Sequence, residues 1–179
     1  MGGEEEIKPI GKGGVESIRK QLSPLLRTGV KEAEIQLPNG SMLVLNRLVN
    51  RDGSLGALVD KYSVLTEVET DYSSVIIGSR VERASINNSY IVYSTVGEKD
   101  HRFRTSVASS TVYGSTIKPG CNINSSKING CIISNNSKVI GAVLEHKEVS
   151  GEAWSGNSSV WYMARKQKRS FASPKKILT

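Results

Sequence analysis

The sequence predicts a mainly β protein, a three-sided parallel β-solenoid of four to five coils with a helix and hairpin cap before it and a basic tail after it. Three observations predict this fold. Between residues 74 and 144, a triplet of one small residue, any residue and one branched aliphatic recurs thirteen times. Its aliphatics lie five or six residues apart in every step but one, which fits neither a helix nor one long strand. Sliding the sequence by sixteen residues aligns the triplets, so three units make one coil.

Stacked coils align the aliphatics into three inward columns, because successive turns lie about 4.8 Å apart and repeat the same backbone path. The predicted columns are Ile76, Ile91, Val112, Ile128 and Leu144; Val81, Val96, Ile117 and Ile133; and Ile86, Val107, Ile123 and Val139. The residue two places before each aliphatic also points inward, where only a small side chain fits. Cys121 and Cys131 occupy such positions, so we expect both to be inert packing residues.

Residues 1–62 are expected to cap the first coil, and residues 63–150 to form the solenoid. Val15, Ile18, Leu22 and Leu25 share one face of a helix over 14–26, which Ser23-Pro24 is expected to split into two short helices. Three further features follow: a hairpin of 34–37 and 42–45 around Pro38-Asn39-Gly40-Ser41, a turn at 50–53, and an irregular first coil within 55–68.

Residues 151–179 are expected to form an aromatic cap and a basic tail. The triplet rule fails where Lys147 and Glu152 take the small position, so the prism is expected to close near 145–150. Trp154, Trp161 and Tyr162 are then expected to cover its open core. The tail carries six cations and no acid: Arg165, Lys166, Lys168, Arg169, Lys175 and Lys176. The chain has 24 Lys and Arg residues, so 18 remain against 17 acids, and most of the net charge of +7 belongs to the tail.

The triplet, the glycines in its turns and the three units per coil resemble the left-handed parallel β-helix of hexapeptide-repeat proteins. These are the acyltransferases and the carboxy-terminal domains of sugar nucleotidyltransferases, and the resemblance covers residues 74–144. It implies a homo-oligomer, with a trimer favoured. Five-residue steps outnumber six-residue ones, which is nearer to the four-sided pentapeptide-repeat proteins, but the sixteen-residue match favours three sides. Periodicity does not set the handedness, and the general preference for right-handed crossovers opposes the family's left-handed coil.

The single step of eleven residues between Val96 and Val107 predicts a loop over 97–104 at one corner, and such loops often carry function. In the resembled acyltransferases, a histidine near such a loop acts as general base, and the acyl donor lies between subunits. The resemblance therefore implies His101 as the base, Arg102 and Arg104 as phosphate ligands, and a coenzyme A thioester as cofactor. The alternative interpretation is an ordinary solvated loop. His146 is expected to be a surface or cap residue.

Other classes are disfavoured. A zinc site of three histidines needs more than the two present, so we expect no metal, and no cofactor outside the acyltransferase alternative. No Gly-rich nucleotide loop occurs, which leaves at most a regulatory subunit related to sugar nucleotidyltransferase β-helix domains. No apolar run approaches the roughly 18 residues of a membrane span, and we expect a soluble intracellular protein.

The sequence favours a non-catalytic structural or assembly protein, because its scaffold signature is complete and a catalytic one is not. We expect self-association, and contact between the basic tail and RNA, DNA or an acidic protein. The trimeric acyltransferase and the regulatory subunit are the alternatives.

Overall fold

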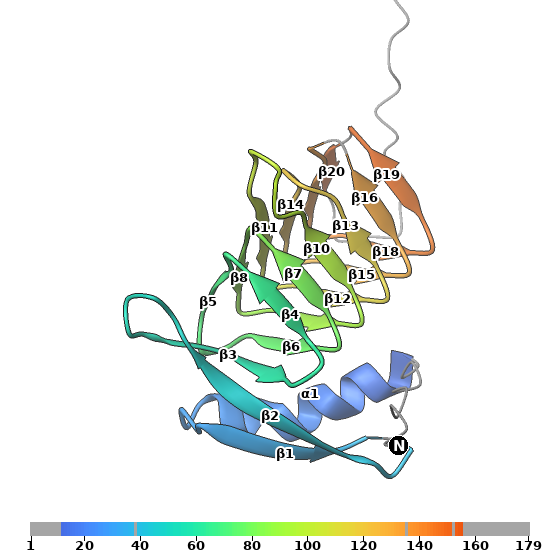
Figure 1. Ribbon diagram of the computed structural model, residues 1–179. Helices are drawn as coiled ribbons and strands as arrows, with labels where there is room; N and C mark the ends of the chain where they lie inside the picture. The colour runs from blue at the N-terminus through green and yellow to red at the C-terminus, as the bar shows by residue number, and fades with distance from the viewer. Residues whose placement is uncertain (1–11, 38, 135, 152, 156–179) are drawn as a thin grey trace, which may run out of the picture.

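The computed structural model describes residues 12–37, 39–134, 136–151 and 153–155, and it is a three-sided parallel β-solenoid of six turns (Figure 1). Each turn contributes one strand to each of three sheets. The first sheet contains β3 (Leu55–Asp60), β6 (Val75–Ile77), β9 (Tyr90–Val92), β12 (Thr111–Tyr113), β15 (Lys127–Asn129) and β18 (Val143–Glu145). The second contains β4 (Val64–Thr66), β7 (Arg80–Glu82), β10 (Thr95–Gly97), β13 (Thr116–Ile117), β16 (Ile132–Ser134) and β19 (Glu148–Ser150). The third contains β5 (Glu69–Thr70), β8 (Ala84–Asn87), β11 (Thr105–Ala108), β14 (Asn122–Asn124), β17 (Lys138–Ile140) and β20 (Ala153–Ser155).

The three inward columns are confirmed in register. In the first sheet, Ile76 pairs with Ile91, and the series continues through Val112 and Ile128 to Leu144. The columns predicted for the other two sheets pair in the same way. All thirteen aliphatics are at most 3% exposed, so stacking buries them as one continuous core.

The small inward serines form a hydrogen-bonded relay, which the packing argument from sequence did not anticipate. The Ser94 hydroxyl donates to the Val92 carbonyl at 2.8 Å and accepts the Ser115 N–H of the next turn at 3.2 Å. Ser115 repeats the pattern with the N–H of Cys131, and a second relay runs through Ser74, Ser89, Ser110 and Ser126. Serine therefore suits these positions by its hydroxyl as well as by its size, because the buried N–H groups need acceptors.

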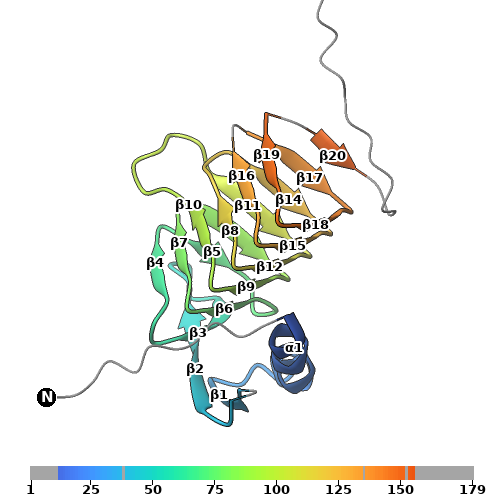
Figure 2. The same ribbon diagram turned by 90° about the vertical axis from the view of Figure 1, so that its right-hand side faces the viewer.

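The N-terminal cap extends the first sheet and covers its outer face. Helix α1 (Lys12–Leu26) packs its apolar side against outward residues of that sheet, among them Val75 and Ile77, which explains why these are apolar. The hairpin of β1 (Glu32–Gln36) and β2 (Met42–Val49) is confirmed, and β2 pairs antiparallel with β3. In Figures 1 and 2, α1 lies beside this hairpin, at the end of the stack where the first turn begins.

The expected split of α1 is wrong. Pro24 lies inside a single helix that ends two residues later, so the ring removes one N–H donor in the last turn and breaks no further bonds. The Ser23 hydroxyl donates to the Arg19 carbonyl at 2.7 Å, one turn back along the same helix.

The expected closure near 145–150 is also wrong. Strands β19 and β20 complete a sixth turn, with Val149 in register with Ile133 and Trp154 in register with Val139. Lys147 occupies the small position but is only half-buried, so its charge does not have to be fully removed from water. Trp161, Tyr162 and the six tail cations lie outside the described residues. Within the described residues, no helix is long and apolar enough to cross a membrane.

Candidate functional site

The 97–104 loop leaves the stack at the corner between the second and third sheets, where it joins β10 to β11 (Figure 2). Gly97 begins it with φ of +79°, and a Cβ there would lie 1.9 Å from the Glu82 carbonyl oxygen, so only glycine fits. The Glu82 carboxylate then accepts the Lys99 N–H at 3.2 Å. Hydrogen bonds from Arg80, at 2.8 and 3.0 Å, hold the pKa of Glu82 below its ordinary value. The loop is therefore anchored by an ionised, nearly buried carboxylate.

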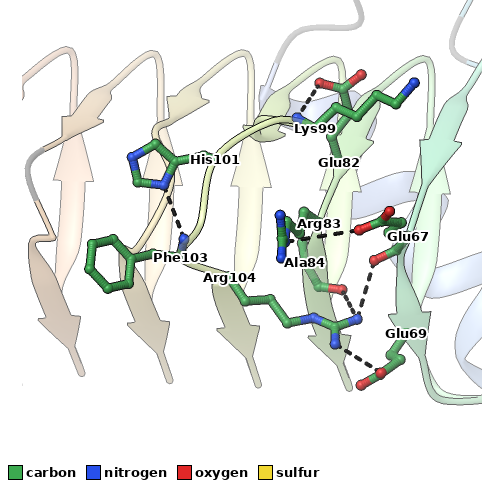
Figure 3. Close-up of polar contacts among 9 residues, drawn as sticks. All are labelled: Glu67, Glu69, Glu82, Arg83, Ala84, Lys99, His101, Phe103 and Arg104. Carbon is green, nitrogen blue, oxygen red and sulfur yellow. Dashed lines mark hydrogen bonds and ion pairs between the residues drawn. The ribbon is translucent and has the colours of Figure 1, made fainter.

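Arg104 at the end of this loop binds the protein itself (Figure 3). Its guanidinium donates to the Glu69 carboxylate at 2.8 Å, and to the carbonyls of Glu67 and Ala84 at 3.2 and 3.3 Å. Because these acceptors belong to two earlier turns of the solenoid, Arg104 holds the end of the loop against both turns.

His101 points away from these contacts of Arg104. Figure 3 shows His101 and Phe103 directed toward the later turns, whereas Arg104 reaches toward the earlier ones. The His101 Nδ1 accepts the Phe103 N–H at 3.2 Å, and the two rings lie 5.6 Å apart. The acyltransferase alternative needs a groove between subunits, which a single chain does not contain, so the roles of His101, Arg102 and Arg104 in it stay predictions.

A cavity of about 720 Å³ lies between this loop and the turn that follows β2. The turn at 50–54 and the chain from Leu65 to Thr70 form its walls. Four arginines line it: Arg51, Arg83, Arg102 and Arg104. Three carboxylates do so too: Asp52, Glu67 and Glu69. The structure therefore brings together Arg102 and Arg104, which were predicted as anion ligands, and does not bring His101 to the same cavity.

Sequence reasoning missed Arg51, Glu67, Glu69 and Arg83. A signal for two of them was present, because strand pairing places Glu67, Arg83 and Arg104 at one corner on three successive turns. Extending the repeat alignment to the outward corner positions would have shown this charged column. Nothing in the spacing indicated that Arg51, from the cap, would join it.

The other residues considered from the sequence, Cys121, Cys131 and His146, do not line the cavity. Cys121 and Cys131 are free, each is 1% exposed, and burial raises the pKa of the Cys121 thiol. His146 is exposed, and its imidazole lies over Gly130, where a Cβ would come within 2.5 Å of Nδ1. Among the described residues, no group of three His, Cys, Asp or Glu side chains is arranged to hold a metal ion.

Comparison of the chain with protein-family models and with curated proteins finds no match. The likeness to hexapeptide-repeat proteins therefore rests on the repeat pattern and on the parallel solenoid.

Proposed function

We propose that this protein is a non-catalytic assembly protein, a self-associating β-solenoid whose basic tail contacts nucleic acid. The observation that carries the proposal is that the sheets end in edge strands at both ends of the stack. Among the described residues, β4 and β5 at one end of the stack, and β18, β19 and β20 at the other, each have one neighbouring strand. A strand at the edge of a sheet is a template for pairing with another chain.

The two ends are not equivalent. The hairpin occupies the edge of the first sheet at the N-terminal end, which prevents all three sheets from continuing there into a second stack. Among the described strands, those of the last turn end all three sheets. Ile132 donates to the Lys147 carbonyl and Gly151 donates to the Ser134 carbonyl, so by alternation the Glu148 N–H points away from β16. A second copy that brings its own last turn to this end pairs with three strands at once.

The tail supports the second part of the proposal by its charge. Its six cations lie beyond the last acid of the chain, and the release of counterions from nucleic acid would drive their binding. Tyr162 and Phe171 beside them offer faces on which the bases of a single strand stack. All of these residues lie outside the described residues.

The native mass, measured by light scattering at several concentrations, tests self-association. We expect a multiple of 19.4 kDa for the full chain, and the value also tests the predicted trimer. Glu148→Pro removes an edge donor without removing a hydrogen bond among the described residues, so it should reduce the mass while circular dichroism stays native. Glu148→Gln removes only the charge and should keep the assembly. A full chain that stays monomeric at about 100 µM contradicts the proposal.

Fluorescence anisotropy with a labelled single-stranded RNA tests the tail. We expect the binding constant to fall as the salt concentration rises. In a plot of the logarithm of the binding constant against that of the salt concentration, the slope should lie between zero and about −4, the limit for six phosphate contacts on a single strand. Replacing the six cations by Gln should abolish binding and leave the native mass unchanged. Binding that survives this replacement contradicts the role of the tail.

A further inference from the structure

The cavity at the corner is built from parts that are distant in sequence. Its walls come from the cap turn at 50–54, the first turn of the solenoid and the inserted loop, and its volume of about 720 Å³ is typical of small-molecule sites. The turn is closed by the Asp52 carboxylate, which accepts both the N–H and the hydroxyl of Ser54, at 3.0 and 2.6 Å. Asn50 ties it to the solenoid by donating to the Thr70 carbonyl at 2.8 Å.

The charged side chains that line the cavity differ in whether they have an oppositely charged partner. Arg104 is paired with Glu69 at 2.8 Å, and Arg83 lies 3.9 Å from Glu67. Asp52 is engaged by its own turn. Within the described ranges, Arg51 and Arg102 line the cavity and neither is ion-paired with a carboxylate. The Arg102 guanidinium lies over the Phe103 ring, 4.5 Å from its centroid. Because stacking on a ring leaves the charge of a guanidinium in place, two positive charges at the cavity are not neutralised by a carboxylate.

The inner wall of the cavity is apolar. Leu48, Leu65 and Val68 border it, and all three are partly buried against the core of the prism. Pockets of this kind bind a ligand through burial of its apolar body and orient it by a few polar groups. A ligand that suits the site carries an anionic head for the arginines and an apolar body for this wall.

We propose that this cavity binds an organic phosphate monoester with an apolar or aromatic body. A phosphate monoester carries a charge of about −2 near neutral pH, which matches the two arginines that no carboxylate neutralises. Arginine also binds phosphate oxygens in a bidentate geometry. The site is independent of the basic tail and of the strand edges that support self-association.

Isothermal titration of the full chain with phenyl phosphate tests the proposal, with inorganic phosphate, benzoate and phenol as comparison ligands. We expect phenyl phosphate to bind more tightly than inorganic phosphate, because the ring gains the apolar wall. Benzoate should bind more weakly because it offers a single negative charge, and phenol should not bind measurably. Benzoate binding as tight as that of phenyl phosphate would show a carboxylate site and overturn the assignment of a phosphate.

Arg51→Gln and Arg102→Gln should each weaken phenyl phosphate binding by about tenfold or more, since each removes a charge-assisted hydrogen bond. Both side chains are exposed, so the fold should tolerate these changes. Arg27→Gln is the matched control, because Arg27 is also exposed and does not line the cavity. The titration repeated in the chain with a Gln-substituted tail should give the same affinity.

Two outcomes overturn the proposal: no phenyl phosphate binding at millimolar concentration, or a loss of binding that is equal for the Arg51, Arg102 and Arg27 variants. Binding that disappears only when the tail is substituted would assign the anion to the tail and also overturn it.

Discussion

The serine relay makes a prediction that separates hydrogen bonding from packing. Ser94→Ala removes the oxygen that accepts the Ser115 N–H at 3.2 Å, at a place where both residues are at most 3% exposed. Serine and alanine differ little in volume, so the cavity term is small. A buried donor left without a partner costs about 1–3 kcal/mol. We therefore expect the free energy of unfolding to fall by about 2 kcal/mol.

Urea unfolding followed by circular dichroism measures this loss, which should shift the midpoint by on the order of 1 M. Hydrogen exchange of the Ser115 amide should accelerate at the same time. Thr95→Ala, at the next and exposed position, is the control and should change stability by less than about 1 kcal/mol. Ser94→Cys should be milder than Ser94→Ala, since Cys131 occupies this column naturally and its Sγ donates to the Asn129 carbonyl at 3.2 Å. A Ser94→Ala variant with wild-type stability and exchange would refute the relay and leave size as the only requirement.

Three further perturbations follow from the same geometry. Ile128→Asp places a carboxyl where Ile128 is 1% exposed, and protonating that carboxyl at pH 7 alone costs about 4 kcal/mol. The native circular dichroism should therefore be lost, whereas the control variant Asn129→Asp should fold. Gly97→Ala should destabilise the loop and accelerate amide exchange in it, because its Cβ meets a carbonyl at 1.9 Å, whereas Gly13→Ala, with open space around its Cβ, should be neutral or stabilising. The lowered pKa of Glu82 predicts a stability contribution that is present above about pH 4.5 and is lost as the pH falls through the folded-state pKa; a Glu82→Gln variant with the same acid dependence as the wild type would contradict this.

Sequence was sufficient for the inner surface of the solenoid. Every predicted pair of the three columns, from Ile76 with Ile91 to Val139 with Ile123, is present in register. The reason is that period-2 alternation and the exclusion of large side chains from the small positions act within a few residues. Each triplet therefore determines by itself which of its residues point inward.

The ends were harder to predict because the rule weakens there. Lys147 suggested that the prism had closed, yet its side chain is only half-buried, so the sixth turn tolerates a charged residue at this position. Pro24 suggested a broken helix, yet a proline in the final turn removes a single donor and the packing of α1 against the first sheet compensates for it. In both places, burial in the assembled fold decided the outcome.

The candidate site divides in the same way. The eleven-residue step predicted the loop and therefore the corner at which Arg102 and Arg104 lie. It could not indicate that Arg104 is bound to Glu69, 35 residues away. Nor could it indicate that Arg51 of the cap lines the same cavity as Arg102, because this depends on how the cap turn lies against the first coil.

By itself, the sequence determined the period, the three sheets and the buried columns of this protein, since these follow from local spacing that repeats in every coil. Only the tertiary structure decided which residues meet between turns and against the cap: α1 over Val75 and Ile77, the serine hydroxyls with the N–H groups of the next turn, and the arginines around the cavity. These contacts depend on the register between turns and on the position of the cap, so their partners lie too far apart in the chain for any local pattern to join them.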